Sequence, residues 1–232
     1  IMRIQLVILL ALFSLVTRAQ TSFSDQSSNL FYPFVNSGAP MGVADMNGDG
    51  LDDIIRIDNG STIRFDYQPS TGNAFTGISL GQLQGSQWGM CIADADKNGY
   101  NDLFTGGAYN GLKLYLADDS GTSYDLSIIS MIPIFLQGAN FADINMNGDV
   151  DIFACNDVGL SHAYSNDGSG DFSYDLNLIN TSSTVPSDNS GNYGSVWTDY
   201  DSDGDLDLYI SKCRQGITDP NDGRRINLLF EN

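Results

Sequence analysis

The chain has 232 residues, and its 29 acidic and 10 basic side chains give a formal net charge of −19. So negative a chain argues against nucleic acid and anionic membrane surfaces as partners. Aromatic residues make up an ordinary 11%, so we expect a packed core in one large or two small domains.

The N-terminus, residues 1–19, is typical of an export signal. Arg3 supplies a positive end, an apolar run extends from Ile4 to Val16, and small residues precede Gln20. The run is short for a membrane span, although an N-terminal anchor is the alternative. We predict a cleaved signal peptide, no transmembrane span, and a mature chain at 20–232 that is secreted or held at the cell surface.

The mature chain repeats one loop pattern, D-x-[DN]-x-[DN]-G-x-x-D. The four copies span residues 45–53, 94–102, 143–151 and 199–207. Each follows an apolar residue and a small one, and each is followed by two apolar residues. A loop that recurs with its flanks at intervals of roughly 50 residues is an internal repeat.

The side chains at loop positions 1, 3, 5 and 9 predict a cation site. Oxygen-only ligands suit a hard cation, and flexible coordination by six to eight oxygens suits calcium best. We expect about four structural calcium ions, held by Asp45, Asn47, Asp49, Asp53, Asp94, Asp96, Asn98, Asp102, Asp143, Asn145, Asn147, Asp151, Asp199, Asp201, Asp203 and Asp207.

The number of carboxylates ranks these four sites. The loop at 199–207 has four carboxylates at the ligand positions and the loop at 143–151 has two. Lys97 adds a positive charge near the second loop. Ligand charge is one term that sets calcium affinity, so we predict that the fourth loop binds tightest and the third weakest.

Two other calcium architectures do not fit this pattern. An EF-hand needs flanking helices and a Glu at loop position 12, where this chain has Arg56, Thr105, Ala154 and Ile210. Nonapeptide β-helices repeat at a far shorter period.

The rest of each repeat reads as short strands. Residues 53–57, 62–67, 112–116 and 206–210 are typical of strands, and turn signals rich in Asp, Asn and Gly separate such stretches. Helical periodicity is not sustained in the mature chain. About 50 residues hold four short strands, the size of a propeller blade. We therefore predict an all-β fold of about four four-stranded blades.

Residues 42–54, Gly-Val-Ala-Asp-Met-Asn-Gly-Asp-Gly-Leu-Asp-Asp-Ile, resemble the FG-GAP/VCBS repeat, the blade of integrin-alpha-like β-propellers. The resemblance covers about residues 21–232 and implies calcium-binding blades, commonly seven to a propeller. For activity the resemblance implies little, because the family includes adhesins, receptor headpieces and accessory domains of secreted enzymes. We predict a scaffold or binding module for extracellular protein or glycan. The alternative is the propeller part of a secreted polysaccharide lyase or hydrolase.

The residues favour a non-enzyme. His162 is the single histidine and lies in a strand-like stretch, and the chain has no elbow motif for a nucleophile. Calcium binding explains the Asp residues better than a glycosidase pair does. Arg214, Arg224 and Arg225 form a basic cluster that is interpreted as solvated turns or as a patch for carboxylate or sulfate.

The last repeat is one strand short. Asn232 aligns with Asn166, after which the third repeat continues into another strand. We expect a fragment of a longer propeller, because an unpaired last strand is an aggregation hazard. The alternative is a strand from residues 21–25 that closes a four-bladed ring.

Three cysteines, Cys91, Cys155 and Cys213, occupy different places in their repeats. An odd number cannot pair completely within one chain. We expect buried small residues, and a bridge between Cys155 and Cys213 is the alternative.

Overall fold

A computed structural model describes residues 22–36, 40–181 and 189–232. The predicted signal peptide lies outside this part of the chain. None of the helices among the described residues has the length and apolar character needed to cross a membrane.

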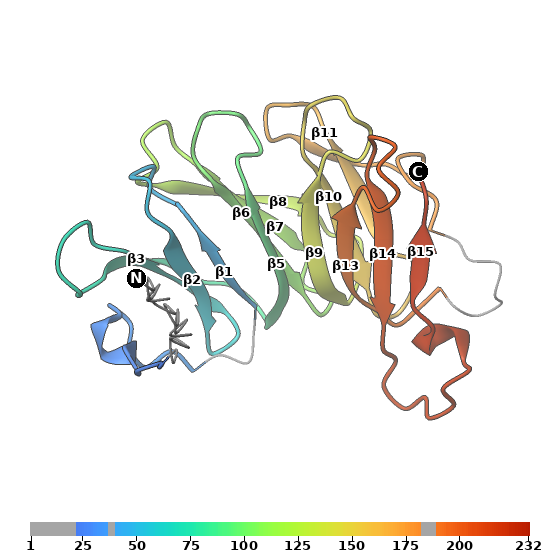
Figure 1. The fold of residues 1–232 in the computed structure, drawn as a ribbon, viewed down its shortest axis with the longest axis horizontal. Helices are drawn as coiled ribbons and strands as arrows, with labels where there is room; N and C mark the ends of the chain where they lie inside the picture. Colours follow the sequence, from blue (N-terminus) through green and yellow to red (C-terminus); the bar gives the residue numbers. More distant parts are fainter. Residues whose placement is uncertain (1–21, 37–39, 182–188) are drawn as a thin grey trace, which may run out of the picture.

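The described residues fold into four antiparallel sheets, one for each loop repeat (Figure 1). The first three sheets have four strands in chain order and the fourth has three. Two 3-10 turns, Ser27–Asn29 and Gly223–Arg225, are the only helical elements that the structure describes. The all-β prediction is confirmed, and each sheet has the size of a propeller blade. The strands are β1 (Met41–Ala44), β2 (Asp53–Asp58), β3 (Thr62–Tyr67), β4 (Thr76–Gln82), β5 (Gln87–Ala93), β6 (Asp102–Gly107), β7 (Leu112–Ala117), β8 (Tyr124–Ser130), β9 (Leu136–Ala142), β10 (Asp151–Asn156), β11 (His162–Asn166), β12 (Phe172–Tyr174), β13 (Asn192–Thr198), β14 (Asp207–Lys212) and β15 (Leu228–Phe230).

The core lies between neighbouring sheets. Side chains alternate between the two faces of a strand, so consecutive residues of β6 pack on opposite neighbours. Leu103 joins the cluster shared with the first sheet, whereas Phe104 joins the cluster shared with the third. The second strand of the third sheet repeats the division, with Ile152 facing the second sheet and Phe153 the fourth. Hydrophobic residues on both faces of these strands therefore stack the sheets like blades.

The row of blades is open in the described structure. Its exposed face on the fourth sheet carries a cross-strand row of apolar side chains, Val196, Tyr209 and Leu229, which are 57%, 39% and 52% exposed. In the other three sheets, the cross-strand pairs equivalent to Tyr209 and Leu229 are buried against the next sheet: Ile55 and Phe65, Phe104 and Leu114, and Phe153 and Ala163. On the first sheet, the segment at 22–36 covers part of the opposite face, where the Tyr32 amide donates to the buried carboxylate of Asp66.

The last sheet supports the predicted alignment of the repeats. The amide of Asn232 donates to Asp207, as the amide of Asn166 does to Asp151. Residues 22–25 form no strand, so the described residues do not build the closed four-bladed ring that we considered as the alternative.

The cysteines are free thiols. Cys155 is buried, where its thiol donates to Ser195, but Cys91 is half-buried and Cys213 is exposed. The expectation of burial is therefore wrong for Cys213. It follows the end of β14, where the chain leaves the sheet for a surface turn, and no bridge to Cys155 forms.

Candidate metal centres

Each predicted loop connects the first and second strands of its sheet. The four loops therefore lie at the same end of the molecule, at the top of Figure 1. The turns between the third and fourth strands lie at that end too, because strands alternate in direction in an antiparallel sheet.

The Asp at loop position 9 is buried in all four repeats, with exposures of 0% or 1%. One carboxylate oxygen accepts the amide of loop position 2, at 2.7 to 3.2 Å. The other accepts an amide that follows or ends the third strand, at 2.8 to 3.1 Å. We had expected these residues only as metal ligands. They also tie each loop to its sheet: Asp53, Asp102, Asp151 and Asp207.

The Asp at loop position 1 shapes the loop itself. Its Oδ2 accepts the amide of the glycine at position 6, at 2.8 to 3.2 Å, in every repeat. These glycines have φ between +82° and +105°, a backbone conformation that other residues rarely adopt. The sequence therefore predicted a turn that the structure builds four times: Gly50, Gly99, Gly148 and Gly204.

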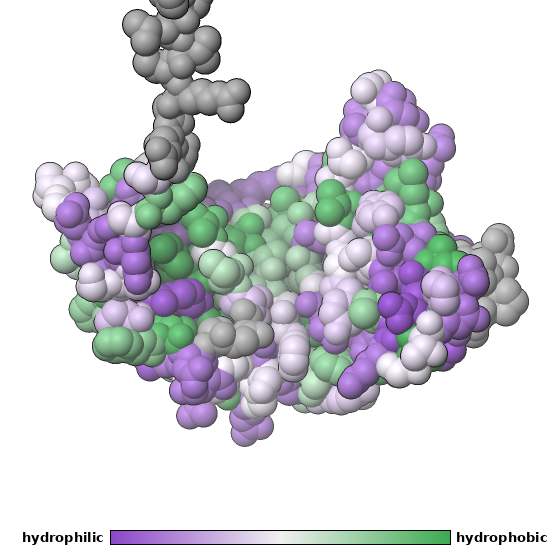
Figure 2. All heavy atoms as spheres, turned by 60° about the horizontal axis from the view of Figure 1, so that its bottom comes forward, coloured by the Kyte–Doolittle hydropathy of each residue, from purple (hydrophilic) through white to green (hydrophobic). Residues whose placement is uncertain are grey.

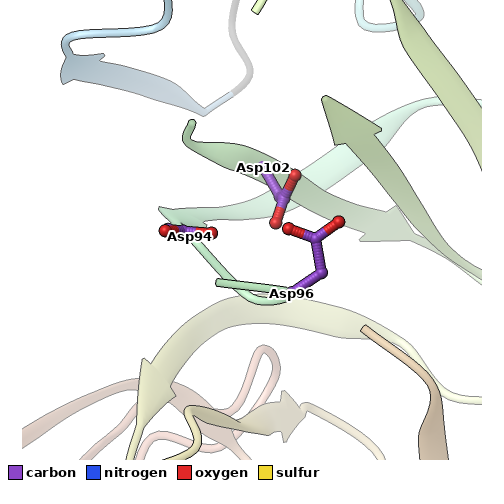
Figure 3. Close-up of side chains that lie close together, drawn as sticks. All are labelled: Asp94, Asp96 and Asp102. Carbon is purple, nitrogen blue, oxygen red and sulfur yellow. The ribbon is translucent and has the colours of Figure 1, made fainter. Parts of the chain in front are cut away.

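Two loops bring three carboxylates together. In the second loop, oxygens of Asp94, Asp96 and Asp102 lie within 4.8 Å of one another (Figure 3). In the fourth loop, Asp199, Asp201 and Asp207 do the same. In the second loop, Oδ1 of Asp94 is buried and finds no hydrogen-bond donor among the described residues. A set of oxygen ligands that includes an unpartnered buried carboxylate oxygen fits a hard cation.

The ionisation of these carboxyls responds to burial. The pKa of Asp102 is raised to about 6, chiefly by burial. Its two backbone hydrogen bonds lower the pKa, and the charges of Asp96 and Asp94 contribute to raising it. Burial also raises the pKa of Asp96, Asp53 and Asp151. Desolvation and like charge both disfavour the ionised form, whereas a bound cation favours it.

The other predicted ligands are not gathered in the same way. In the first loop, both oxygens of Asp45 accept amides of its own loop, and Asp49 caps the Leu51 amide. Three carboxylates do not converge there. The third loop has only Asp143 and Asp151, and its two Asn side chains accept backbone amides.

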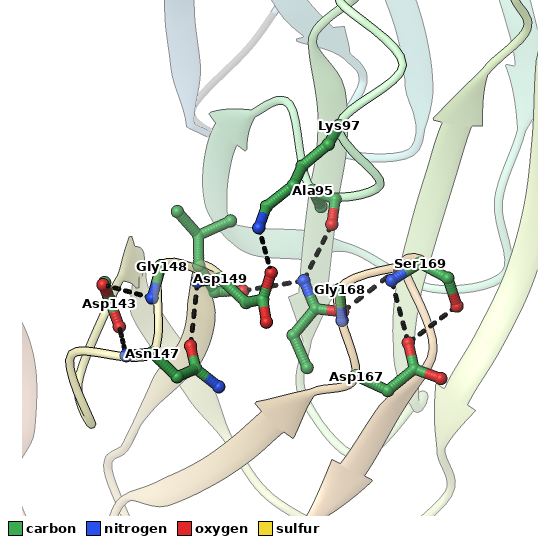
Figure 4. A network of polar contacts seen from close by, with 12 residues as sticks. Ala95, Lys97, Asp143, Asn147, Gly148, Asp149, Asp167, Gly168 and Ser169 are labelled. Atoms are coloured by element: carbon green, nitrogen blue, oxygen red, sulfur yellow. Dashed lines mark hydrogen bonds and ion pairs between the residues drawn. The ribbon is translucent and has the colours of Figure 1, made fainter.

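Loops two and three are joined by polar contacts (Figure 4). The Nζ of Lys97 forms an ion pair with Asp149 at position 7 of the third loop. The Asn166 side chain, at the end of β11, donates to the carbonyl of Ala95 at 2.8 Å. Lys97 therefore lies between two loops and neutralises the Asp149 carboxylate of the third one.

Other residues singled out from the sequence lie apart from the loops. His162 is half-buried in β11, with Nδ1 3.3 Å from Oη of Tyr164 and its ring 4.8 Å from that of Tyr174. The three arginines bind separate partners: Arg214 pairs with Asp157, Arg224 pairs with Asp222, and Arg225 donates to a backbone carbonyl. The expected basic cluster is therefore divided.

Comparison with known proteins agrees with this geometry. A search of curated proteins found no match. Residues 143–210, from the third loop into β14, match the model of the FG-GAP-like repeat. The stretch holds two of the four loops, and the same loop-and-sheet unit recurs in the other two. Residues 143–210 are thus similar to FG-GAP-like repeats, and the four described sheets have a propeller-like, blade-on-blade architecture.

Proposed function

We propose that the chain is an exported, calcium-binding propeller scaffold that binds protein or glycan outside the cell and has no catalytic activity of its own. The observation that carries the calcium part is the convergence of Asp94, Asp96 and Asp102 around an unpartnered oxygen. Such sites place like charges together, and a divalent cation would neutralise them.

The ion's contribution would be to folding. It would supply positive charge to carboxylates that repel one another, while the loop residues position those carboxylates. The Asp at position 9 already fixes each loop to its sheet, so a cation held there would link loop, second strand and third strand. Binding energy then becomes folding energy, and calcium at a hundred times the Kd would stabilise the fold by about 2.7 kcal/mol per site.

A calcium titration of the mature chain tests this proposal. We expect the melting temperature to rise with calcium, with magnesium much less effective because it requires a near-octahedral site. Isothermal titration should find about four sites. A melting temperature that calcium does not change would refute the proposal.

The order of the sites is tested by a matched pair, Asp199→Ala and Asp143→Ala. Both remove the residue at loop position 1. The fourth loop has four carboxylates at the ligand positions and the third has two. Asp199→Ala should therefore lower the melting temperature in calcium more than Asp143→Ala does. Equal losses, or a larger loss for Asp143→Ala, would show that carboxylate number does not control affinity.

The absence of catalysis is the second part of the proposal. Among the described residues, the contacts of His162 are with tyrosines rather than with a carboxylate that would orient it as a base. We expect no turnover of polysaccharides or esters by the purified chain. Turnover that disappears in a His162→Gln variant would overturn this expectation.

A further inference from the structure

The end of the molecule opposite the calcium loops holds a hollow of about 350 Å³. Turns that follow the second strands of three successive sheets meet there. Its lining residues are Tyr109, Phe135, Asp157, Val158, Arg214 and Gln215. Figure 2, in which this lower end comes forward, shows hydrophobic and hydrophilic residues side by side on this part of the surface. The volume lies within the usual range for small-molecule sites.

Aromatic rings form one side of the hollow. Tyr109 is 57% exposed and its ring centroid lies 6.0 Å from that of Phe135. The ring centroid of Trp88, which is 44% exposed and is not one of the lining residues, lies 5.9 Å from that of Phe135. Three aromatic rings that remain partly exposed in one place offer flat apolar faces for a ligand.

The backbone holds two of these rings in unusual positions. Trp88 is the extra residue of a β-bulge, because Gln87 pairs with Gly107 and Gly89 with Gly106. A bulge redirects the side chain of the extra residue. Tyr109 has φ of +59°, a left-handed conformation that is uncommon for a residue other than glycine. Strain of this kind often occurs at binding sites.

A buried carboxylate lies in the wall beside the rings. Asp157 is 5% exposed, and its Oδ2 accepts a hydrogen bond from Nη1 of Arg214 at 3.0 Å. Its Oδ1 is buried and has no donor among the described residues. An unsatisfied buried acceptor is costly, so a ligand hydroxyl that reached it would gain a strong, charge-assisted hydrogen bond.

The ion pair also indicates which ligand charge the hollow favours. Asp157 and Arg214 neutralise each other, and the remaining N–H groups of the guanidinium can donate to oxygen atoms. The chain as a whole carries −19, which repels acidic ligands. A neutral ligand with an apolar ring face and several hydroxyls matches the rings, the acceptor and the donor together.

We infer that this hollow is a binding site for a neutral sugar ring of an oligosaccharide, stacked on Tyr109 and hydrogen-bonded to Asp157 and Arg214. The inference rests on the proposed binding function and names its ligand class and place. It does not depend on the calcium loops, which lie at the other end.

Tryptophan fluorescence of the mature chain in calcium provides the test, because Trp88 and Trp197 are the two tryptophans. The probes are neutral hexasaccharides of glucose, mannose and xylose, with a glucuronate oligosaccharide as the acidic control. We expect at least one neutral probe to change the fluorescence saturably and the acidic probe not to bind. Failure of all neutral probes, or binding of the acidic one alone, would overturn the inference.

Variants locate the site. Tyr109→Asn removes the ring with a residue that tolerates the left-handed conformation, and it should weaken binding about tenfold or more, or about 1.4 kcal/mol. Asp157→Asn should also weaken it. Tyr209→Asn, the same change on the exposed face of β14, should leave binding unchanged. If Tyr109→Asn lowers the melting temperature, Asp157→Asn decides alone, because it keeps both tryptophans that report binding. Unchanged binding in the folded variants would refute the site.

Calcium titration of the same proteins tests the loops separately, so the sugar-site inference and the calcium proposal can fail independently.

Discussion

The second and fourth loops contain the same three-carboxylate arrangement in different surroundings. In the second loop Asp94 and Asp96 are half-buried, whereas Asp199 and Asp201 of the fourth are exposed. The second loop has neighbours on both sides. On one side, its Asn101 side chain donates to the Asp45 carbonyl of the first loop. On the other side, Asn166 of the third sheet donates to the Ala95 carbonyl of the second loop. In the described structure the fourth loop has a neighbouring loop on one side only.

The difference shows that the motif and the fold control separate properties of a site. The motif fixes the ligand types and the turn. The neighbouring blade fixes how much water surrounds the charges, and charges interact more strongly when water is excluded. The second loop should therefore be the more rigid site and the fourth the more highly charged one.

The largest expected effect distinguishes the two anchoring carboxylates. Asp102→Ala leaves the amides of Ala95 and Ala117 without their acceptor inside the core, and it should lower the free energy of unfolding by about 2–5 kcal/mol. Asp207→Ala exposes the amides of Tyr200 and Asn232 to water and should cost about 1–2 kcal/mol. Urea unfolding in chelator measures both without calcium. Equal costs would mean that the neighbouring blade does not make the second loop more dependent on its anchor.

Ionic strength should separate the two loops next. Screening acts strongly on exposed charges, because the Debye length falls from about 10 Å at 0.1 M salt to about 3 Å at 1 M. We expect calcium affinity to drop about fivefold or more at the fourth loop and about twofold at the second over this range. Titrations of Asp94→Ala and Asp199→Ala, each lacking one of these sites, assign the losses. A larger loss at the second loop would contradict the comparison.

Lys97 is a smaller influence on the second loop. Its side chain is 54% exposed, so loss of the ion pair with Asp149 in Lys97→Met should change stability by about 1 kcal/mol or less. Removal of the positive charge should tighten calcium binding at the second and third loops about twofold. Arg225→Met, which removes a cation at the other end, is the control. The same gain in that control would point to net charge instead of local charge.

The smallest effect concerns the repeat between the two. Burial lowers the pKa of His162 below its ordinary value of 6.5, so the folded chain favours the neutral ring. Protonation is easier in the unfolded chain, and the stability from the neutral ring is lost as pH falls below about 6.5. Stability measured from pH 7.5 to 5.5 in chelator should fall less steeply in His162→Gln. Parallel curves would show that His162 does not contribute.

The sequence by itself determined the repeat unit and the turn at the centre of its loop. The predicted strands at 53–57, 62–67, 112–116 and 206–210 lie in β2, β3, β7 and β14, within a residue at each end except the last. Local rules sufficed, because alternating apolar residues make strands and a glycine with positive φ makes the turn. The alignment of Asn232 with Asn166 was also visible, and the shared hydrogen bond supports it.

Only the tertiary structure decided which partners each repeated residue contacts. The second role of Asp102 depends on the amide of Ala117, 15 residues away, and the position of Lys97 depends on the next blade. The hollow at the opposite end joins Tyr109, Asp157 and Arg214 from three sheets, and no local pattern links them. Such contacts arise when blades stack, because the stacking brings distant residues together and sets how deeply their charged groups are buried.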